Sequence, residues 1–247
     1  VNYLSGGSSV NPNHKGLNLP VDMAFAFHSD AGTTDNDSII GTLGICSVPN
    51  TAGKAVFENT VSRWASRDLT DIVMTQIVDD VRKLHAPEWT RRGLWNKSYS
   101  ESRVPEVPTM LLELLSHQNF ADMRYGLDPR FRFTVSRSIY KGMLKFLADN
   151  NQLKYVVQPL PVEGFSCKFI DKNKIELRWT AVSDPLEPTA QANRFVLYTR
   201  IDDGDFDNGI LIDSNRAEVS VQPGKIYSFK VTAVNDGGQS FPSETLS

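Results

Sequence analysis

Two residues with reactive side chains come directly after apolar runs. His28 follows the run Val21–Phe27, and Glu113 follows the run Thr109–Leu112. An imidazole can bind a metal ion or carry a proton, and a carboxylate can transfer one. Each also has a plainer interpretation, because a lone histidine after a strand is usually structural and a glutamate there can be a solvated strand end. Whether the two residues are functional or structural depends on whether the fold brings their side chains together.

Strands and helices alternate in the first part of the chain. The apolar runs Val21–Phe27, Ser38–Cys46 and Thr109–Leu112 predict buried strands. Apolar residues in steps of three and four predict a helix from about Ser62 to Leu84, and the N-cap pair Asp128-Pro129 predicts the start of another. This pattern indicates an α/β domain with a mostly parallel or mixed sheet flanked by helices. His28 and Glu113 would then stand at carboxyl ends of strands, where such sheets collect their sites.

The second part of the chain contains only strands and turns. Pro159, Pro161 and Gly164 break the pattern and predict an extended linker over residues 158–164. After it, alternating segments such as Lys174–Trp179 and Tyr227–Val234 predict a β-sandwich. We therefore expect an α/β domain at 1–157, the linker at 158–164 and an all-β sandwich at 165–247.

Bulk composition excludes some classes of protein. With 26 basic and 29 acidic residues the net charge is −3, and no basic patch suggests a nucleic-acid partner. No apolar run approaches the roughly 20 residues that a membrane-spanning helix needs. The cysteines Cys46 and Cys167 are too few for a disulfide framework, so they do not settle the compartment.

The sandwich resembles a fibronectin type III domain. The alternating Tyr227, Phe229, Val231, Ala233 and Asn235, with the Gly, Ser and Pro residues that follow, are similar to the final strands of that family. Trp179 occupies the place of the family's core tryptophan. The resemblance implies a spacer, a packing partner or a weak binding surface, without a catalytic group.

The first part resembles the zinc-dependent N-acetylmuramoyl-L-alanine amidases. Asp22, the apolar run, and His28-Ser29-Asp30-Ala31 are similar to the strand that ends in a zinc-binding histidine, with Asp30 where the family has asparagine. The stretch Val107–Ser116 resembles the segment that carries the catalytic glutamate. Between these two stretches, Arg92-Gly93 and Ser98–Arg103 occupy the place of the family's substrate-side loop. Residues Asn119, Asp122 and the Asp128–Gly142 stretch resemble the closing loop and final helix. The order of these motifs agrees over roughly residues 15–148.

This resemblance implies roles for individual residues. His28 would be a Zn²⁺ ligand and Glu113 the catalytic carboxylate, while His117 and Asp30 are candidates for contact with substrate or metal. Zinc lowers the pKa of bound water and polarises a carbonyl, and a nearby carboxylate moves the proton to the leaving amine.

The family's remaining zinc ligands, a histidine in a Gly-His-Gly-Gly turn and a glutamate, have no counterpart in this sequence. Catalytic zinc sites use three protein ligands, and the chain starts at Val1 without methionine or signal peptide. We therefore expect the other ligands upstream of residue 1, and expect this chain alone to be inactive.

The leading hypothesis is an amidase that cuts the bond between N-acetylmuramic acid and L-alanine in peptidoglycan, in a bacterial cell envelope, either periplasmic or secreted. The alternative is a non-catalytic cell-wall or glycan-binding adhesion protein on an amidase-like scaffold. A hydrolase for another amide or a polysaccharide is a third hypothesis, because fold does not fix substrate.

Overall fold

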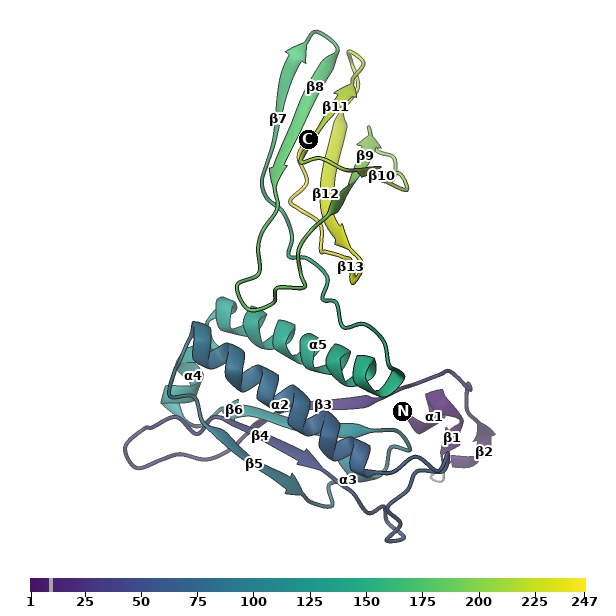
Figure 1. The fold of residues 1–247 in the computed structure, drawn as a ribbon, viewed down its shortest axis with the longest axis vertical. Helices are drawn as coiled ribbons and strands as arrows, with labels where there is room; N and C mark the ends of the chain where they lie inside the picture. Colours follow the sequence, from purple (N-terminus) through teal and green to yellow (C-terminus); the bar gives the residue numbers. More distant parts are fainter. Residues whose placement is uncertain (9–10) are drawn as a thin grey trace. The chain divides into compact units, whose positions relative to one another are not determined.

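The structure, a computed structural model, describes residues 1–8 and 11–247. The chain divides into two compact units, Val1–Leu153 and Lys154–Ser247 (Figure 1). The first unit has helices and a mixed sheet, and the second has only strands and turns.

The first unit is built on a four-stranded mixed sheet with the order β3-β6-β4-β5. The strands are β3 (Ala24–Asp30), β4 (Thr42–Cys46), β5 (Arg91–Asn96) and β6 (Thr109–Ser116). β3 is parallel to β6, β6 is antiparallel to β4, and β4 is parallel to β5. The predicted sheet is therefore present as a mixed one. The strands run further than the apolar pattern indicates, so His28 and Glu113 lie inside β3 and β6 rather than after them.

Two long helices, α2 (Trp64–Leu84) and α5 (Pro129–Asn151), pack together on one face of the sheet (Figure 1). The Asp128 side chain caps α5 by accepting the Arg130 N–H, with Pro129 at the first helical position. The helices approach closely because α5 has Gly142 at the crossing, where a Cβ atom would lie 2.7 Å from the Val73 Cα. Their apolar faces and the strands form the main core.

A charged pair is buried between these helices. Lys141 Nζ lies 2.7 Å from Asp80 Oδ2, and both side chains are 1% exposed. Ser138 and Gln76 also donate hydrogen bonds to Asp80 Oδ2. This arrangement offsets the cost of removing two charges from water.

The opposite face of the sheet is covered by a loop rather than by a long helix. This segment, residues 97–107, is called the strap below and contains the short helix α3 (Ser100–Arg103). Beneath it, Leu43, Ile45 and Leu111 form a small apolar cluster and are almost completely buried. The strap therefore forms the second layer over this part of the sheet.

The remaining elements of the first unit are short. They are α1 (Asn2–Ser5), β1 (Gly7–Ser8), β2 (Asn11–Lys15) and α4 (Phe120–Gly126). In the first turn of α4, the buried Asp122 carboxylate accepts the backbone N–H groups of Ile40, Gly41 and Ser116 and so ties the end of β6 to the segment before β4. No helix in the described part of the chain has the length and apolar character needed to cross a membrane.

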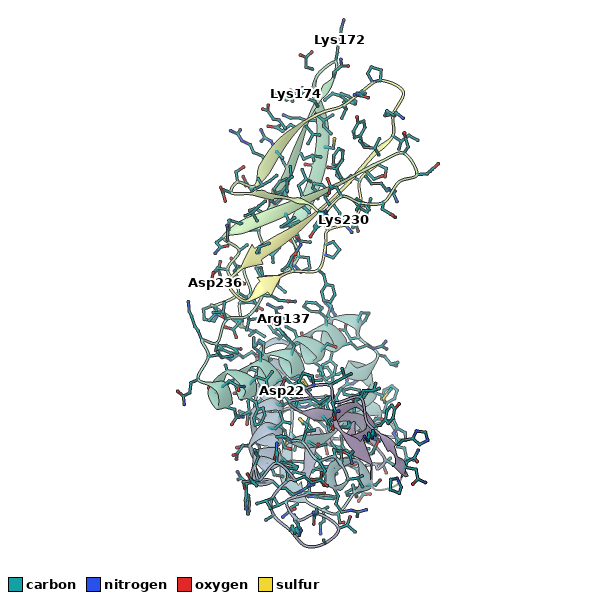
Figure 2. The ribbon with its side chains drawn as sticks, turned by 90° about the vertical axis from the view of Figure 1, so that its right-hand side faces the viewer. Asp22, Arg137, Lys172, Lys174, Lys230 and Asp236 are labelled. Atoms are coloured by element: carbon teal, nitrogen blue, oxygen red, sulfur yellow. The ribbon has the colours of Figure 1, made fainter. Side chains whose placement is uncertain are left out.

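The second unit is a sandwich of two antiparallel sheets, with orders β11-β8-β7 and β10-β9-β12-β13. Its strands are β7 (Glu163–Asp171), β8 (Lys174–Thr180), β9 (Arg194–Ile201), β10 (Ile210–Ile212), β11 (Arg216–Ser220), β12 (Tyr227–Asn235) and β13 (Gly238–Gln239). Trp179 is 2% exposed and its ring contacts those of Phe165 and Phe195. On the outer surface, Lys230 (labelled in Figure 2) lies 4.3 Å from the Phe206 ring centroid.

The residues just before β7 pack on this sandwich. Val157 is completely buried, its N–H donates to Thr189, and its carbonyl accepts from Asn235. Val162, within the segment predicted as a linker, is part of the sandwich core. Of the two cysteines, Cys46 is buried in β4 and Cys167 is exposed on β7.

Candidate active site

His28 and Glu113 are brought together by strand register. In the parallel pair β3–β6, His28 is aligned with Glu113. Aligned residues of neighbouring strands direct their side chains to the same face of a sheet. The apolar neighbours Ala26 and Leu111, two residues earlier on each strand, belong to the cluster under the strap. The pair therefore lies on the strap face, away from the long helices.

Glu113 has the environment of a carboxyl group that can carry a proton. Desolvation raises its pKa above the ordinary value, and the negative charge of Asp30 raises it further. His28 and Arg92 oppose this effect. Its Oε2 atom is buried and has no hydrogen-bond partner within the described part of the chain. A buried carboxylate oxygen without a partner costs stability, so it is a feature that needs a functional explanation.

His28 contacts a carboxylate that comes from the strap. Its Nε2 atom lies 2.9 Å from Glu101 Oε2, and both side chains are partly exposed, at 40% and 52%. Glu101 was not among the residues predicted for the site, although the segment from Ser98 to Arg103 was expected on the substrate side. The only sequence signal was an acidic residue in that segment.

Asp30 completes the charged group at the end of β3. Arg92 on β5 reaches it with an ion pair of 2.6 Å. The Arg92 hydrogen bond and charge hold the pKa of Asp30 below its ordinary value although burial opposes this. Asp30 is thus an ionised, paired carboxylate, and Arg92, which the resemblance placed in the substrate-side loop without a role of its own, is a further site residue.

His117 lies beside Asp30. Its Nδ1 is 3.2 Å from Ser29 Oγ, and its backbone N–H donates to the Asp30 carbonyl. The remaining histidines lie elsewhere: His14 is on the exposed β2, and His85 ends α2 with its Nε2 2.9 Å from Thr134 Oγ1. The site of the described chain therefore centres on His28, Glu113, Glu101, Asp30 and Arg92.

The donor set fits zinc only in part. An imidazole with a neighbouring carboxylate is typical zinc chemistry. Within residues 1–8 and 11–247, however, no three His, Cys, Asp or Glu side chains gather as a metal-binding group. The described residues thus do not form a complete three-ligand zinc site.

Comparison with known proteins identifies one part of the chain. The fibronectin type III domain model matches residues 160–247. No curated protein matches the chain. Among solved structures, the fourth FNIII domain of a human protein is 24% identical, with 36% of this chain and 76% of that one covered and a TM-score of 0.32. The FN5 domain of Drosophila Lar is 17% identical, with 36% and 91% covered and a TM-score of 0.28.

Another match is the twitchin kinase region from C. elegans. It is 20% identical to this chain, which spans only 16% of its length, while 36% of this chain is covered with a TM-score of 0.33. The first unit is not identified by any family model. The family match and the antiparallel sandwich with its buried tryptophan agree: residues 160–247 form a fibronectin type III domain.

Proposed function

We propose that the first unit is the later part of an amide hydrolase, a zinc-dependent N-acetylmuramoyl-L-alanine amidase acting on peptidoglycan. The observation that carries this proposal is the alignment of His28 with Glu113 on neighbouring parallel strands. The raised pKa of Glu113 and its unpartnered buried oxygen support it. The motif resemblance around both residues supplies the substrate class.

In this proposal Glu113 is the proton-transfer group. Hydrolysis of an amide needs a base that takes a proton from water and an acid that gives one to the leaving nitrogen. A carboxyl group with a raised pKa holds its proton at higher pH than an ordinary glutamate, so it delivers a proton more readily near neutral pH. The bond cut would join the lactyl carbonyl of N-acetylmuramic acid to the L-alanine nitrogen.

His28 is proposed as one zinc ligand. When bound, zinc supplies an activated water and a polarised carbonyl. Since the described residues lack a three-donor group, the proposal requires further ligands from residues outside this sequence. Peptidoglycan lies in the cell envelope, so a periplasmic or secreted location is part of the same proposal.

The test compares the parent protein that carries all zinc ligands with its Glu113→Gln variant. We expect zinc in both proteins, release of L-alanine-linked peptides from peptidoglycan by the parent, and a loss of about 100- to 10,000-fold in the variant. Asp71→Asn is a matched control. Asp71 on α2 forms an ion pair with Arg91 on β5 and does not contact the candidate site residues. A parent without zinc, or a variant as active as the parent, would refute the proposal and favour a non-catalytic cell-wall binding protein.

A further inference from the structure

The hydrogen bond between His28 and Glu101 has a donor and an acceptor that can be assigned from their chemistry. Glu101 as a carboxylate can only accept hydrogen bonds, so the 2.9 Å contact requires a proton on His28 Nε2. A neutral imidazole carries one ring proton, which leaves its lone pair on Nδ1. We infer that Glu101 is a positioning residue that selects the Nε2–H tautomer of His28 and fixes the orientation of its ring.

The strap that carries Glu101 is anchored on the side of β4. The Lys97 N–H donates to the Cys46 carbonyl, which continues the β4–β5 pairing past the end of β5 into the strap. Ser102, next to Glu101, is completely buried, and its Oγ lies 2.7 Å from Ser47 Oγ. The residue after Glu101 is therefore fixed to the sheet, although Glu101 itself is partly exposed.

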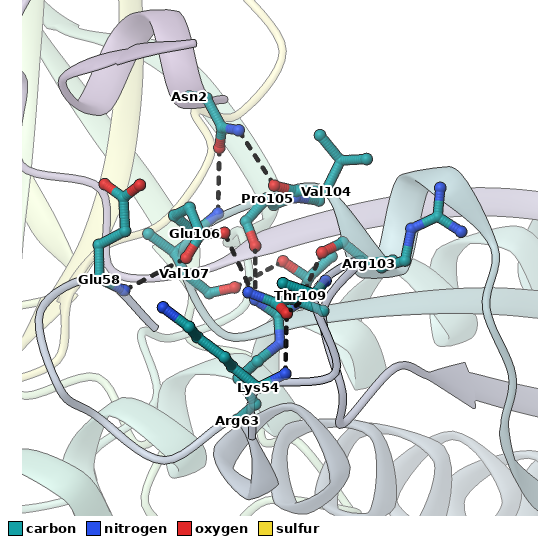
Figure 3. Close-up of polar contacts among 12 residues, drawn as sticks. Asn2, Lys54, Glu58, Arg63, Arg103, Val104, Pro105, Glu106, Val107 and Thr109 are labelled. Atoms are coloured by element: carbon teal, nitrogen blue, oxygen red, sulfur yellow. Dashed lines mark hydrogen bonds and ion pairs between the residues drawn. The ribbon is translucent and has the colours of Figure 1, made fainter. Parts of the chain in front are cut away.

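A buried arginine anchors the other end of the strap. Arg63 precedes α2 and is completely buried, and its guanidinium donates to the Arg103 carbonyl at 2.6 Å and to the Pro105 carbonyl at 3.4 Å (Figure 3). It also lies 3.7 Å from Glu106 and over the Phe57 ring. Burial lowers the pKa of Arg63, and the charge of Glu106 opposes that change.

A third anchor lies at the outer edge of the strap. The Asn2 side-chain amide donates to the Val104 carbonyl and accepts the Glu106 N–H, both at 3.0 Å (Figure 3). Three separate contacts thus fix the backbone on both sides of α3. An ion pair formed from a free loop would also have to order the loop backbone, and these anchors remove that part of the entropy cost.

A fixed tautomer matters for a histidine that binds a metal ion. A carboxylate that accepts one ring N–H orients the ring, sets the tautomer and raises the basicity of the other nitrogen. Glu101 would therefore present Nδ1 of His28 as the ligating atom. This use of the tautomer rests on the proposed function, whereas the tautomer itself is a property of the present chain.

The experiment measures the protonation of His28 in this chain by long-range ¹H–¹⁵N NMR, at a pH where the ring is neutral. We expect one form of His28, protonated on Nε2, in the wild type. Glu101→Ala should produce a measurable second form protonated on Nδ1 and a more mobile ring. Glu101→Gln should keep the single form, because the amide oxygen can still accept the N–H.

Two controls separate tautomer selection from a structural effect. Asp71→Asn removes another partly exposed acidic side chain and should leave the His28 signals unchanged. His117, which contacts Ser29, should keep its signals in all variants. A wild-type His28 protonated on Nδ1, or unchanged His28 signals in Glu101→Ala, would overturn the inference. Neither result depends on amidase activity, so the inference and the proposed function can fail separately.

Discussion

The two faces of the sheet in the first unit hold ionisable groups in opposite ways. On the helix face, Lys141 and Asp80 are almost completely buried and contact each other directly. On the strap face, Glu113 is half-buried, has an oxygen without a partner among the described residues, and has a raised pKa. The first pair is closed to solvent and each charge has an opposite charge beside it, although Asp80 Oδ1 has no hydrogen-bond partner among the described residues. Glu113 is only half-buried, has no cation from the described part of the chain in direct contact, and desolvation disfavours its charged form, which is the condition expected of a site that binds something.

The contrast assigns the Lys141–Asp80 pair to the stability of the fold and Glu113 to the candidate site. A buried ion pair that loses one member leaves the other charge uncompensated, and the fold suffers. A half-buried carboxyl group whose charged form is disfavoured already costs stability, so its removal should not damage the fold. The predictions below test this contrast from the largest expected effect to the smallest.

Lys141→Met should cause the largest loss of stability. The substitution leaves Asp80 buried without its cation, and we expect the free energy of unfolding to fall by about 3–5 kcal/mol. Urea denaturation followed by circular dichroism measures this. Glu101→Ala is the matched control on the strap face, where the ion pair is partly exposed and its loss should cost about 0–1 kcal/mol. Equal losses in the two variants would contradict the contrast.

Gly142→Ala should destabilise the packing of α2 against α5. The new methyl group would meet the Val73 Cα at 2.7 Å, and separating the helices should cost about 1–3 kcal/mol. Thermal unfolding of the first unit measures the effect. Gly93→Ala on β5 is the control, because a Cβ atom there meets no atom of residues 1–8 or 11–247 within 4 Å. A stable Gly142→Ala variant would show that the helix face tolerates repacking.

Glu113→Gln should slightly stabilise the fold at neutral pH. The folded pKa of Glu113 is raised above 4.5, so the native state holds this proton more tightly than the unfolded state and loses stability as the pH rises above 4.5. Glutamine is neutral throughout, so the variant should match the wild type at about pH 3 and exceed it at about pH 7. Denaturation across this pH range tests the sign. A variant less stable at pH 7 would mean that the charged form of Glu113 is favoured.

Asp71→Asn should have the smallest effect. Its partner Arg91 is partly exposed, as is Asp71 itself, and solvent screens such a pair. We expect the free energy of unfolding to stay within about 0.5 kcal/mol of the wild type. The same urea titration detects a larger change, and only a loss of about 3–5 kcal/mol would show that this surface pair contributes as much as the buried one.

The elements with a strong repeating pattern could be predicted from the sequence. The steps of three and four residues before Leu84 and the Asp128-Pro129 cap indicate α2 and α5 because a helix buries one stripe of its surface. The alternation around Tyr227–Val234 indicates the sandwich for the corresponding reason in a strand. Strand ends were less clear: β6 continues past Glu113 to Ser116, since one polar residue interrupts a run that is otherwise buried.

The partners in the candidate site could be predicted only in part. His28 and Glu113 follow apolar runs and carry motifs, so the sequence singles them out. Glu101 belongs to a strap without periodicity, and its contact with His28 depends on anchors from Ser47, Arg63 and Asn2 in three distant segments. Local patterns contain no information on such contacts.

The way the strap is held has a consequence for how its sequence can change. Arg63 binds the carbonyl oxygens of Arg103 and Pro105 rather than their side chains, and Asn2 binds the backbone at Val104 and Glu106. Every amino acid has a backbone carbonyl, so substitutions at positions 103 and 104 would keep these contacts. Related proteins could therefore vary the outer surface of the strap, and with it the molecules they recognise, while Glu101 keeps its place beside His28.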